Sequence, residues 1–337
     1  MRHRSYCFVQ VLLLLALLPL SACGGPAQPS VDLVAEQPAP NPAATVPSAQ
    51  PKAFTIGLVM KTLTNPFFVE MEKGARQAEK DYGINLVVRT GAQETSIEQQ
   101  IAIVRDMIKE NVDAIVIAPA DSSELIPVLK EAQDAGVFIV NIDNQLNPTI
   151  AAQKGLQNVP YISVDNEQGA YKSAKVLSDQ ITSPTEVAIL EGIRTAQNAE
   201  DRKNGAQRAF AENPNVQLVA AETANWQIDE AHDVIESIFA DHPQIKAVFA
   251  ANDMMALGVI QYLNEAGRAD VLVAAYDALD EAKKAIRTGT LQATVDQQAA
   301  LQGYQGVAAA MRLLQGEPVE PLTLVDTMLI TKDNVNP

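Results

Sequence analysis

Short apolar runs alternate with segments of helical spacing over most of the chain after residue 53. The first run, Phe54–Met60, is apolar at nearly every position, as expected for a strand buried on both faces of a sheet. The following segment, Pro66–Asp81, carries its apolar residues at helical spacing. Further strands are predicted at Ile84–Val88, Asp113–Pro119, Val137–Asp143, Tyr161–Asp165, Glu186–Gly192, Val216–Glu222, Lys246–Asn252 and Val271–Asp277.

Helix signals stand between the predicted strands. Thr95, with Glu98 three residues later, forms a capping box that predicts the start of a helix. Asp121 and Glu124 predict the start of the next helix, and Gly136 predicts its end. Later helices are predicted from Glu167, up to Phe210, from Asp229, from Asp253 and up to Arg287.

This alternation predicts an α/β fold with doubly wound parallel sheets, covered by helices and joined by right-handed crossovers. The alternating region is about 270 residues long, which is large for one sheet and suits two. A closed eight-stranded barrel is the alternative. The repeats run past eight and residues 144–160 interrupt them, so two sheets are favoured.

Residues 1–22 predict a secretion signal. Two arginines form a basic start, and the apolar run Val9–Leu20 is shorter than the roughly 20 residues that span a membrane. The ending Leu20-Ser21-Ala22-Cys23 resembles the lipobox of bacterial lipoproteins, which implies cleavage before Cys23 and attachment of lipid to its thiol. A transmembrane anchor and ordinary cleavage near Ala22 are the alternatives.

Residues 23–53 predict a lipidated cysteine followed by a tether. Residues 24–52 contain seven of the 19 prolines and no aromatic residue, a composition that favours extended conformations over a packed core. We therefore expect a globular body outside the cytoplasm, linked to a membrane through Cys23. Cys7 would leave with the signal, so the mature chain could form no internal disulfide.

The composition argues against several classes of function. The chain has 41 acidic and 25 basic residues, and loss of the two signal arginines changes its formal charge from −16 to −18. Such a charge disfavours nucleic acid and anionic lipid as partners. P-loop, dinucleotide-binding, GxSxG and HExxH motifs are absent, and the chain has three histidines. We predict no enzymatic activity, no cofactor and no metal site.

Polar side chains recur where the predicted strands end. In open parallel sheets, ligands bind beyond the carboxyl ends of the strands. Those positions hold Lys61–Phe68, Asp143-Asn144, Glu191-Gly192, Asn252-Asp253 and Tyr276-Asp277. A single such group is more often a helix cap, but their repetition favours a binding site.

Six motifs resemble the ribose-binding-protein family of bacterial sugar ABC transporters. They are TLTNPFFVEMEKGA (Thr62–Ala75), NIDNQ (Asn141–Gln145), NAEDRKNGA (Asn198–Ala206), FAANDMMALG (Phe249–Gly258), AAYD (Ala274–Asp277) and LQATVDQ (Leu291–Gln297). The resemblance implies two similar lobes of the type I periplasmic binding fold, joined by three crossings. It implies a first lobe of residues 54–164 plus 297–324 and a second of residues 165–296 plus 325–337.

The resemblance also implies the residues that contact a sugar. They are Lys61, Asn65, Phe67, Phe68, Asp143, Asn144, Arg202, Trp226, Asn252, Tyr276, Asp277 and Gln297. Sugars have apolar C–H faces and a rim of hydroxyls, so Phe67 and Trp226 are expected to stack while Asp143 accepts and Arg202 donates hydrogen bonds. The alternatives are core packing for Phe68 and a surface position for Trp226.

Three positions depart from the ribose-binding pattern. Lys61 replaces a small hydroxyl residue, Ala118 an asparagine, and Asn144 an arginine beside Asp143. Loss of these hydroxyl-reading groups should change the preferred ligand. We therefore expect another monosaccharide or a polyol in place of ribose. Lys61 is expected either to read a hydroxyl or to be a solvated charge at the rim.

The resemblance implies a monomeric solute-binding protein that closes on its ligand and delivers it to a membrane permease. Glu70, Glu72 and Asp253 are candidate exposed acids for contacts with that permease. The alternatives are a sensory protein that docks on a chemoreceptor or kinase, an extracytoplasmic glycosidase, and the effector domain of a sugar-responsive repressor. The predicted signal argues against the repressor.

Overall fold

The computed structural model describes residues 53–335. The predicted signal, Cys23 and residues 24–52 of the predicted tether lie outside the described residues. The described residues belong to one compact unit. Among the described residues, no helix has the length and apolar character needed to cross a membrane.

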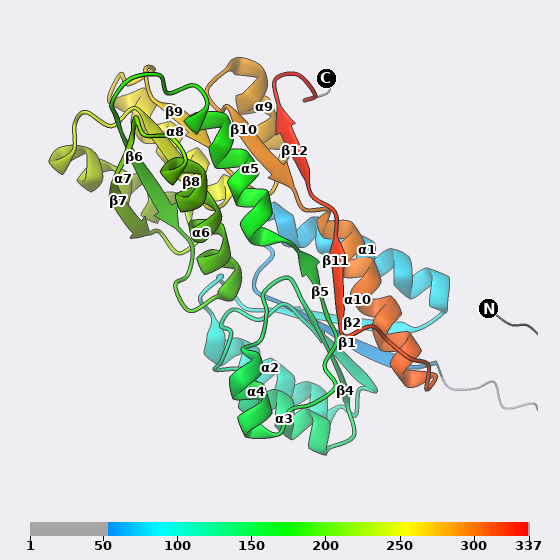
Figure 1. The fold of residues 1–337 in the computed structure, drawn as a ribbon. Helices are drawn as coiled ribbons and strands as arrows, with labels where there is room; N and C mark the ends of the chain where they lie inside the picture. Colours follow the sequence, from blue (N-terminus) through cyan, green and yellow to red (C-terminus); the bar gives the residue numbers. More distant parts are fainter. Residues whose placement is uncertain (1–52, 336–337) are drawn as a thin grey trace, which may run out of the picture. The chain divides into compact units, whose positions relative to one another are not determined.

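The first lobe is built on a six-stranded parallel sheet in the order β11-β5-β4-β3-β1-β2 (Figure 1). Its strands are β1 (Thr55–Met60), β2 (Asn85–Thr90), β3 (Ala114–Ile117), β4 (Phe138–Ile142), β5 (Tyr161–Val164) and β11 (Leu322–Val325). Its helices are α1 (Pro66–Tyr82), α2 (Ile97–Lys109), α3 (Ile126–Asp134), α4 (Pro148–Lys154) and α10 (Ala299–Leu314).

The second lobe repeats this plan on a sheet in the order β12-β10-β9-β8-β6-β7, in which only β12 is antiparallel to its neighbour among the described strands. Its strands are β6 (Thr185–Glu191), β7 (Val216–Thr223), β8 (Ala247–Ala250), β9 (Leu272–Ala274), β10 (Ala293–Asp296) and β12 (Met328–Thr331). Its helices are α5 (Asn166–Ser178), α6 (Gln197–Ala211), α7 (Ile228–Asp241), α8 (Asp253–Glu265) and α9 (Asp280–Thr288).

The chain passes between the two sheets three times, from β5 to α5, from β10 to α10 and from β11 to β12 (Figure 1). The predicted fold class of two doubly wound lobes joined by three crossings is confirmed. The central strands β3 and β8 are buried at every position, which explains their uninterrupted apolar sequences. The barrel is ruled out because each sheet is open and the two are separate.

Close helix packing covers each sheet. A Cβ at Gly74 of α1 would collide with the Ala300 carbonyl of α10, and a Cβ at Gly205 of α6 would collide with the Glu167 carbonyl of α5. These glycines therefore allow two helix pairs to approach backbone to backbone. In this way α5 and α10, each of which starts directly after a crossing, are held against a neighbour in their own lobe.

The predicted capping box at Thr95 is wrong. Helix α2 has Ser96 at its N-cap, without a side-chain cap hydrogen bond, and Ser96 Oγ instead accepts from Gln93 N at 3.0 Å. The turn that precedes α2 directs Glu94 into the interior, where it is 6% exposed. A local sequence pattern was here overridden by tertiary burial.

Residues 144–160, read as irregular, contain helix α4. Asn147 caps it by accepting from Thr149 N and Ile150 N, and Gly155 ends it with a left-handed φ of 75°. The helix has no buried residue, so it leaves no apolar periodicity in the sequence.

Candidate functional site

A small cavity lies where the carboxyl ends of the two sheets face each other. Its lining residues come from both lobes: Lys61, Asn65, Phe67, Phe68, Glu94, Asp143, Asn198, Arg202, Trp226, Asn252, Asp277 and Gln297. Ten of these belong to the set predicted from sequence. Asn144 and Tyr276 of that set do not line the cavity, whereas Glu94 and Asn198 were not predicted.

The loop between β1 and α1 supplies one wall. Asn65 caps α1 by accepting from Phe67 N at 3.0 Å, and its Nδ2 donates to Glu94 Oε1 at 2.8 Å. The rings of Phe67 and Phe68 meet edge to face with centroids 5.1 Å apart. Phe68 is 2% exposed and also lines the cavity, so it combines core packing with a place in the site.

Lys61 and Asp143 form an ion pair inside the first lobe. Lys61 Nζ lies 2.9 Å from Asp143 Oδ2, and both side chains are 3% exposed. Asp143 has a φ of 64°, and its carbonyl accepts from Tyr161 Oη at 2.9 Å and Ser163 Oγ at 2.7 Å. The alternative of a solvated rim charge for Lys61 is therefore wrong.

Arg202, on α6 of the second lobe, is held from several sides. Its Nε donates to Asn166 Oδ1 at 2.8 Å and its Nη1 to the Ala251 carbonyl at 2.9 Å. Longer contacts reach Asp277 Oδ1 at 3.4 Å and Gln297 Oε1 at 3.3 Å. The guanidinium is thus oriented by its contacts with the protein.

Two aromatic rings enclose that guanidinium. Its carbon lies 3.9 Å from the ring centroid of Tyr276 and 5.4 Å from that of Trp226. Tyr276 is fully buried, with its hydroxyl packed against Gly169, so it supports Arg202 from behind and does not face the cavity. Tyr276 was predicted to contact the ligand directly, whereas in the structure it stacks on Arg202.

Trp226 lines the cavity and is only 4% exposed, so a surface position is ruled out. It has a φ of 68°, and a Cβ at Gly192 would collide with its indole ring. Gly192, at the end of β6, therefore leaves the space in which the indole lies. Asn252 caps α8 by accepting from Met255 N at 2.8 Å, and its Nδ2 donates to the Trp226 carbonyl at 3.4 Å.

Glu94 and Asn198 were not singled out from sequence, although signals for both existed. Glu94 follows β2, so the rule of strand ends would have included it had the segment not been read as a capping box. Asn198 stands four residues before Arg202 on α6, which places both on one helix face. Asn144 lies behind the cavity, where its Nδ2 donates to the Pro119 carbonyl at 3.1 Å.

The site concentrates carboxylates that water does not reach. Burial raises the pKa of Asp277 to about 7, although Arg202 opposes the effect. Burial also raises the pKa of Glu94, with Lys61 opposing, and burial together with Asp277 raises that of Asp253. Asp253 accepts from Leu279 N and Thr294 Oγ1, each at 2.7 Å, and is fully buried. The expectation that Asp253 is an exposed permease contact is therefore wrong.

The raised pKa of Asp277 predicts a loss of stability with rising pH. Its pKa in the unfolded chain is about 3.9, so the folded protein binds more protons between about pH 4 and pH 7. Unfolding free energy without ligand should fall as pH rises through this window, and Asp277→Asn should weaken that dependence. Urea unfolding at pH 5 and pH 8 measures it, with Asp280→Asn as an exposed control; an equal pH dependence in Asp277→Asn would contradict the assignment.

Several buried polar atoms around the cavity have no hydrogen-bond partner among the described residues. They are Asn198 Oδ1, Trp226 Nε1 and Asp143 Oδ2, the last of which is engaged only by the ion pair with Lys61. Buried polar atoms are normally satisfied, so such a cluster calls for a specific explanation. A ligand that carries both donors and acceptors would satisfy Asn198 Oδ1 and Trp226 Nε1.

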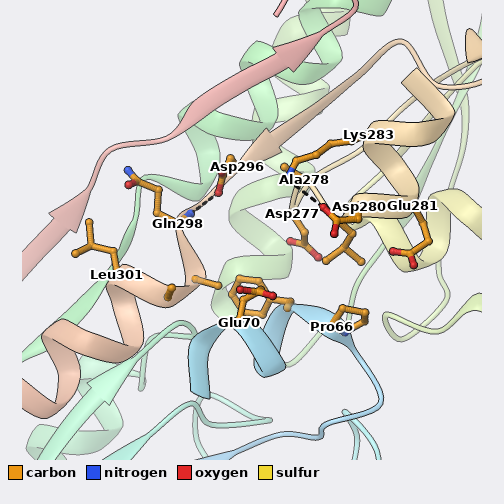
Figure 2. Close-up of a pocket in the computed structure, with 14 residues that line it drawn as sticks. Pro66, Glu70, Asp277, Ala278, Asp280, Glu281, Lys283, Asp296, Gln298 and Leu301 are labelled. Atoms are coloured by element: carbon orange, nitrogen blue, oxygen red, sulfur yellow. Dashed lines mark hydrogen bonds and ion pairs between the residues drawn. The ribbon is translucent and has the colours of Figure 1, made fainter. Parts of the chain in front are cut away.

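A groove beside the cavity touches both lobes and the crossing from β10 to α10 (Figure 2). Figure 2 shows Pro66 and Glu70 of α1 across from the segment Asp277–Lys283, with Gln298 and Leu301 on another side. Phe67 and Asp277 line both the groove and the cavity. Among residues 53–335, no cluster of three or more His, Cys, Asp or Glu side chains could hold a metal ion.

The fold and the polar cavity lined by both lobes define a two-lobed binding protein. A family model described as "Periplasmic binding protein domain" matches residues 56–318, and the chain belongs to this family. The predicted resemblance to the ribose-binding proteins is confirmed. The chain is 39% identical over 282 residues to the D-ribose/D-allose-binding protein of Pseudomonas aeruginosa, covering 83% of this chain and 88% of the relative.

Two further comparisons support the same family. The chain is 33% identical over 312 residues to the ribose import binding protein of Bacillus subtilis, covering 93% of this chain and 94% of the relative. The solved structure of an ABC transporter periplasmic solute binding protein from Actinobacillus succinogenes 130z, with bound D-allose, is 37% identical. It superposes with a TM-score of 0.79 and covers 84% of this chain and 99% of that chain.

Proposed function

We propose that this protein is the extracytoplasmic solute-binding component of a bacterial ABC importer for a monosaccharide or related polyol. The observation that carries the proposal is the polar cavity, which is lined by residues of both lobes and includes buried polar atoms without a hydrogen-bond partner among the described residues. Relatives 39% and 33% identical are named as D-ribose/D-allose and ribose import binding proteins.

Capture would proceed by closure of the two lobes. We propose lobes of residues 54–164 plus 297–324 and of residues 165–296 plus 325–337, with movement at the three crossings. A sugar that contacts both lobes stabilises the closed arrangement by its differential affinity for that state. The cavity lining supports this mechanism because it includes residues such as Asp143 from the first lobe and Arg202 from the second.

The chemistry of the lining suits a pyranose or furanose ring. Phe67 and Trp226 are proposed to face the apolar C–H surfaces, while carboxylates, amides and Arg202 bind the hydroxyls. Glu94 and Lys61 add two charged groups in the first lobe. We favour a hexose such as D-allose over ribose, in line with the three departures from the ribose-binding pattern and with the D-allose bound in the Actinobacillus succinogenes structure.

Calorimetry and thermal shift with pentoses, hexoses, polyols and nucleosides test this proposal. Saturable binding of at least one sugar, with 1:1 stoichiometry, is expected. No heat and no thermal shift with any member of the panel would refute the proposal, and turnover of a bound glycoside would favour the glycosidase alternative. Docking of the loaded protein on a receptor in place of a permease would favour the sensory alternative.

We further propose that the protein acts as a monomer anchored outside the cytoplasm by lipid on Cys23. A Cys23→Ser chain should leave the membrane fraction and lose lipid by mass spectrometry, while its sugar affinity stays unchanged because Cys23 precedes the predicted tether. Equal membrane association of the two chains would contradict the lipid anchor.

A further inference from the structure

Helix α6 begins without a cap of its own. Its N-cap residue is Ala196, which has no side-chain acceptor for the first backbone amides of the helix. Gln197 N instead donates to Ser122 Oγ at 2.9 Å, and Asn198 N lies 3.3 Å from Asn144 Oδ1. Ser122 and Asn144 both belong to the first lobe, whereas α6 belongs to the second.

The two acceptors are held in place within the first lobe. Asn144 Nδ2 donates to the Pro119 carbonyl at 3.1 Å, and Asn144 Oδ1 accepts from Ser122 Oγ at 3.4 Å. The Ser122 carbonyl accepts from Asn147 N at 2.7 Å, so the loops after β3 and β4 are tied together. Both side chains are buried, at 6% exposure for Ser122 and none for Asn144. The acceptors are therefore preorganised for the helix that docks on them.

A third contact strengthens the junction. Ser122 N donates to the Thr195 carbonyl at 3.1 Å, one residue before the N-cap of α6. The same helix carries Asn198 and Arg202, which line the cavity one helical turn apart. The junction therefore sets both the distance between the lobes and the position of two residues that face the proposed ligand.

We propose that Ser122 and Asn144 form a cap across the lobes that stabilises the closed arrangement without contacting sugar. This inference rests on the closure mechanism of the proposed function. When the lobes separate, the first two amides of α6 lose their protein acceptors and Ala196 cannot replace them. The cap raises the fraction of closed protein, and apparent affinity rises in proportion to that fraction. Ser122 and Asn144 are thus positioning residues whose effect is common to all ligands.

The test compares Ser122→Ala, Asn144→Ala and the control Ser123→Ala, whose hydroxyl makes no hydrogen bond to α6 among the described residues. Dissociation constants are measured by calorimetry for every sugar that binds. Ser122→Ala and Asn144→Ala should each weaken binding by about 3- to 10-fold, as expected for loss of one helix cap. The ratio of dissociation constants between sugars should change less than twofold, because neither side chain reads the ligand.

A distance measurement separates this inference from the proposed function. Residues 53–335 contain no cysteine, so Lys109→Cys and Asp241→Cys, in a chain with Cys7 and Cys23 replaced by Ser, provide one label on each lobe. Without sugar, Ser122→Ala should shift the label-to-label distances toward longer values, and Ser123→Ala should not. Failure of all sugars to bind would refute the function but leave this measurement valid.

Two results would refute the proposed cap across the lobes. One is unchanged affinity and unchanged distances in both variants. The other is a changed order of sugar preference in Asn144→Ala, which would place Asn144 among the residues that read the ligand. Ala196→Ser provides a second check, because a cap within α6 benefits the open state most. This variant should weaken binding while it keeps or raises the melting temperature, and tighter binding would contradict the inference.

Discussion

Replacing Arg202 with Ala is expected to abolish measurable sugar binding and to lower the melting temperature. The guanidinium lies between two aromatic rings and is bonded to Asn166 and the Ala251 carbonyl. Its removal leaves Asp277 without its nearest cation inside a buried site. Loss of one partner of a buried ion pair commonly costs about 3–5 kcal/mol. If this cost destabilises only the closed, sugar-bound arrangement, affinity should fall by at least about a hundredfold.

Arg202→Lys should also bind poorly, because an ammonium cannot reproduce a fork that is bonded on several sides and stacked on a ring. The matched control is Arg208→Ala on the same helix, whose exposed side chain pairs with Glu167. Calorimetry and thermal unfolding measure both effects. Affinity within threefold of the parent protein in Arg202→Ala, with a folded structure, would remove Arg202 from the site.

The fold was largely predictable because its signals are local and repeated. Buried parallel strands such as β3 and β8 are apolar throughout, and this pattern survives without knowledge of their neighbours. Helix α4 was missed because none of its residues is fully buried, so its sequence shows no clear apolar periodicity. The places where the chain crosses between the sheets came from the family resemblance and not from the alternation, and neither gave the order of the strands.

The site was predictable where a residue follows a strand, and less so where tertiary packing decides what a side chain faces. Asp143 stands directly after β4, Asp277 stands three residues after the end of β9, and both line the cavity. Tyr276 precedes Asp277 by one residue, yet its side chain packs against Arg202 and does not line the cavity. Asn144 is similarly adjacent to Asp143 and bonds away from the cavity. Adjacent positions are easily confused without coordinates.

Replacing Asp143 with Asn is expected to weaken sugar binding by about a hundredfold or more. A carboxylate can accept hydrogen bonds from paired sugar hydroxyls, and each bond to a charged group contributes roughly 1.5–3 kcal/mol. Asn is the suitable replacement because Asp143 has a φ of 64°, a left-handed conformation that Asn tolerates. The hydrogen bonds that the hydroxyls of Tyr161 and Ser163 donate to the backbone carbonyl of residue 143 should therefore persist.

Asp143→Asn also leaves Lys61 without the carboxylate that lies 2.9 Å from its ammonium, so stability should fall as well. Adding Lys61→Met separates the two effects, because it removes the buried charge that the first change leaves behind. The double variant should regain much of the lost melting temperature but not the affinity, as measured by thermal unfolding and calorimetry beside the exposed control Asp134→Asn. Full recovery of binding in the double variant would mean that Asp143 serves only to pair with Lys61 and does not bind the sugar.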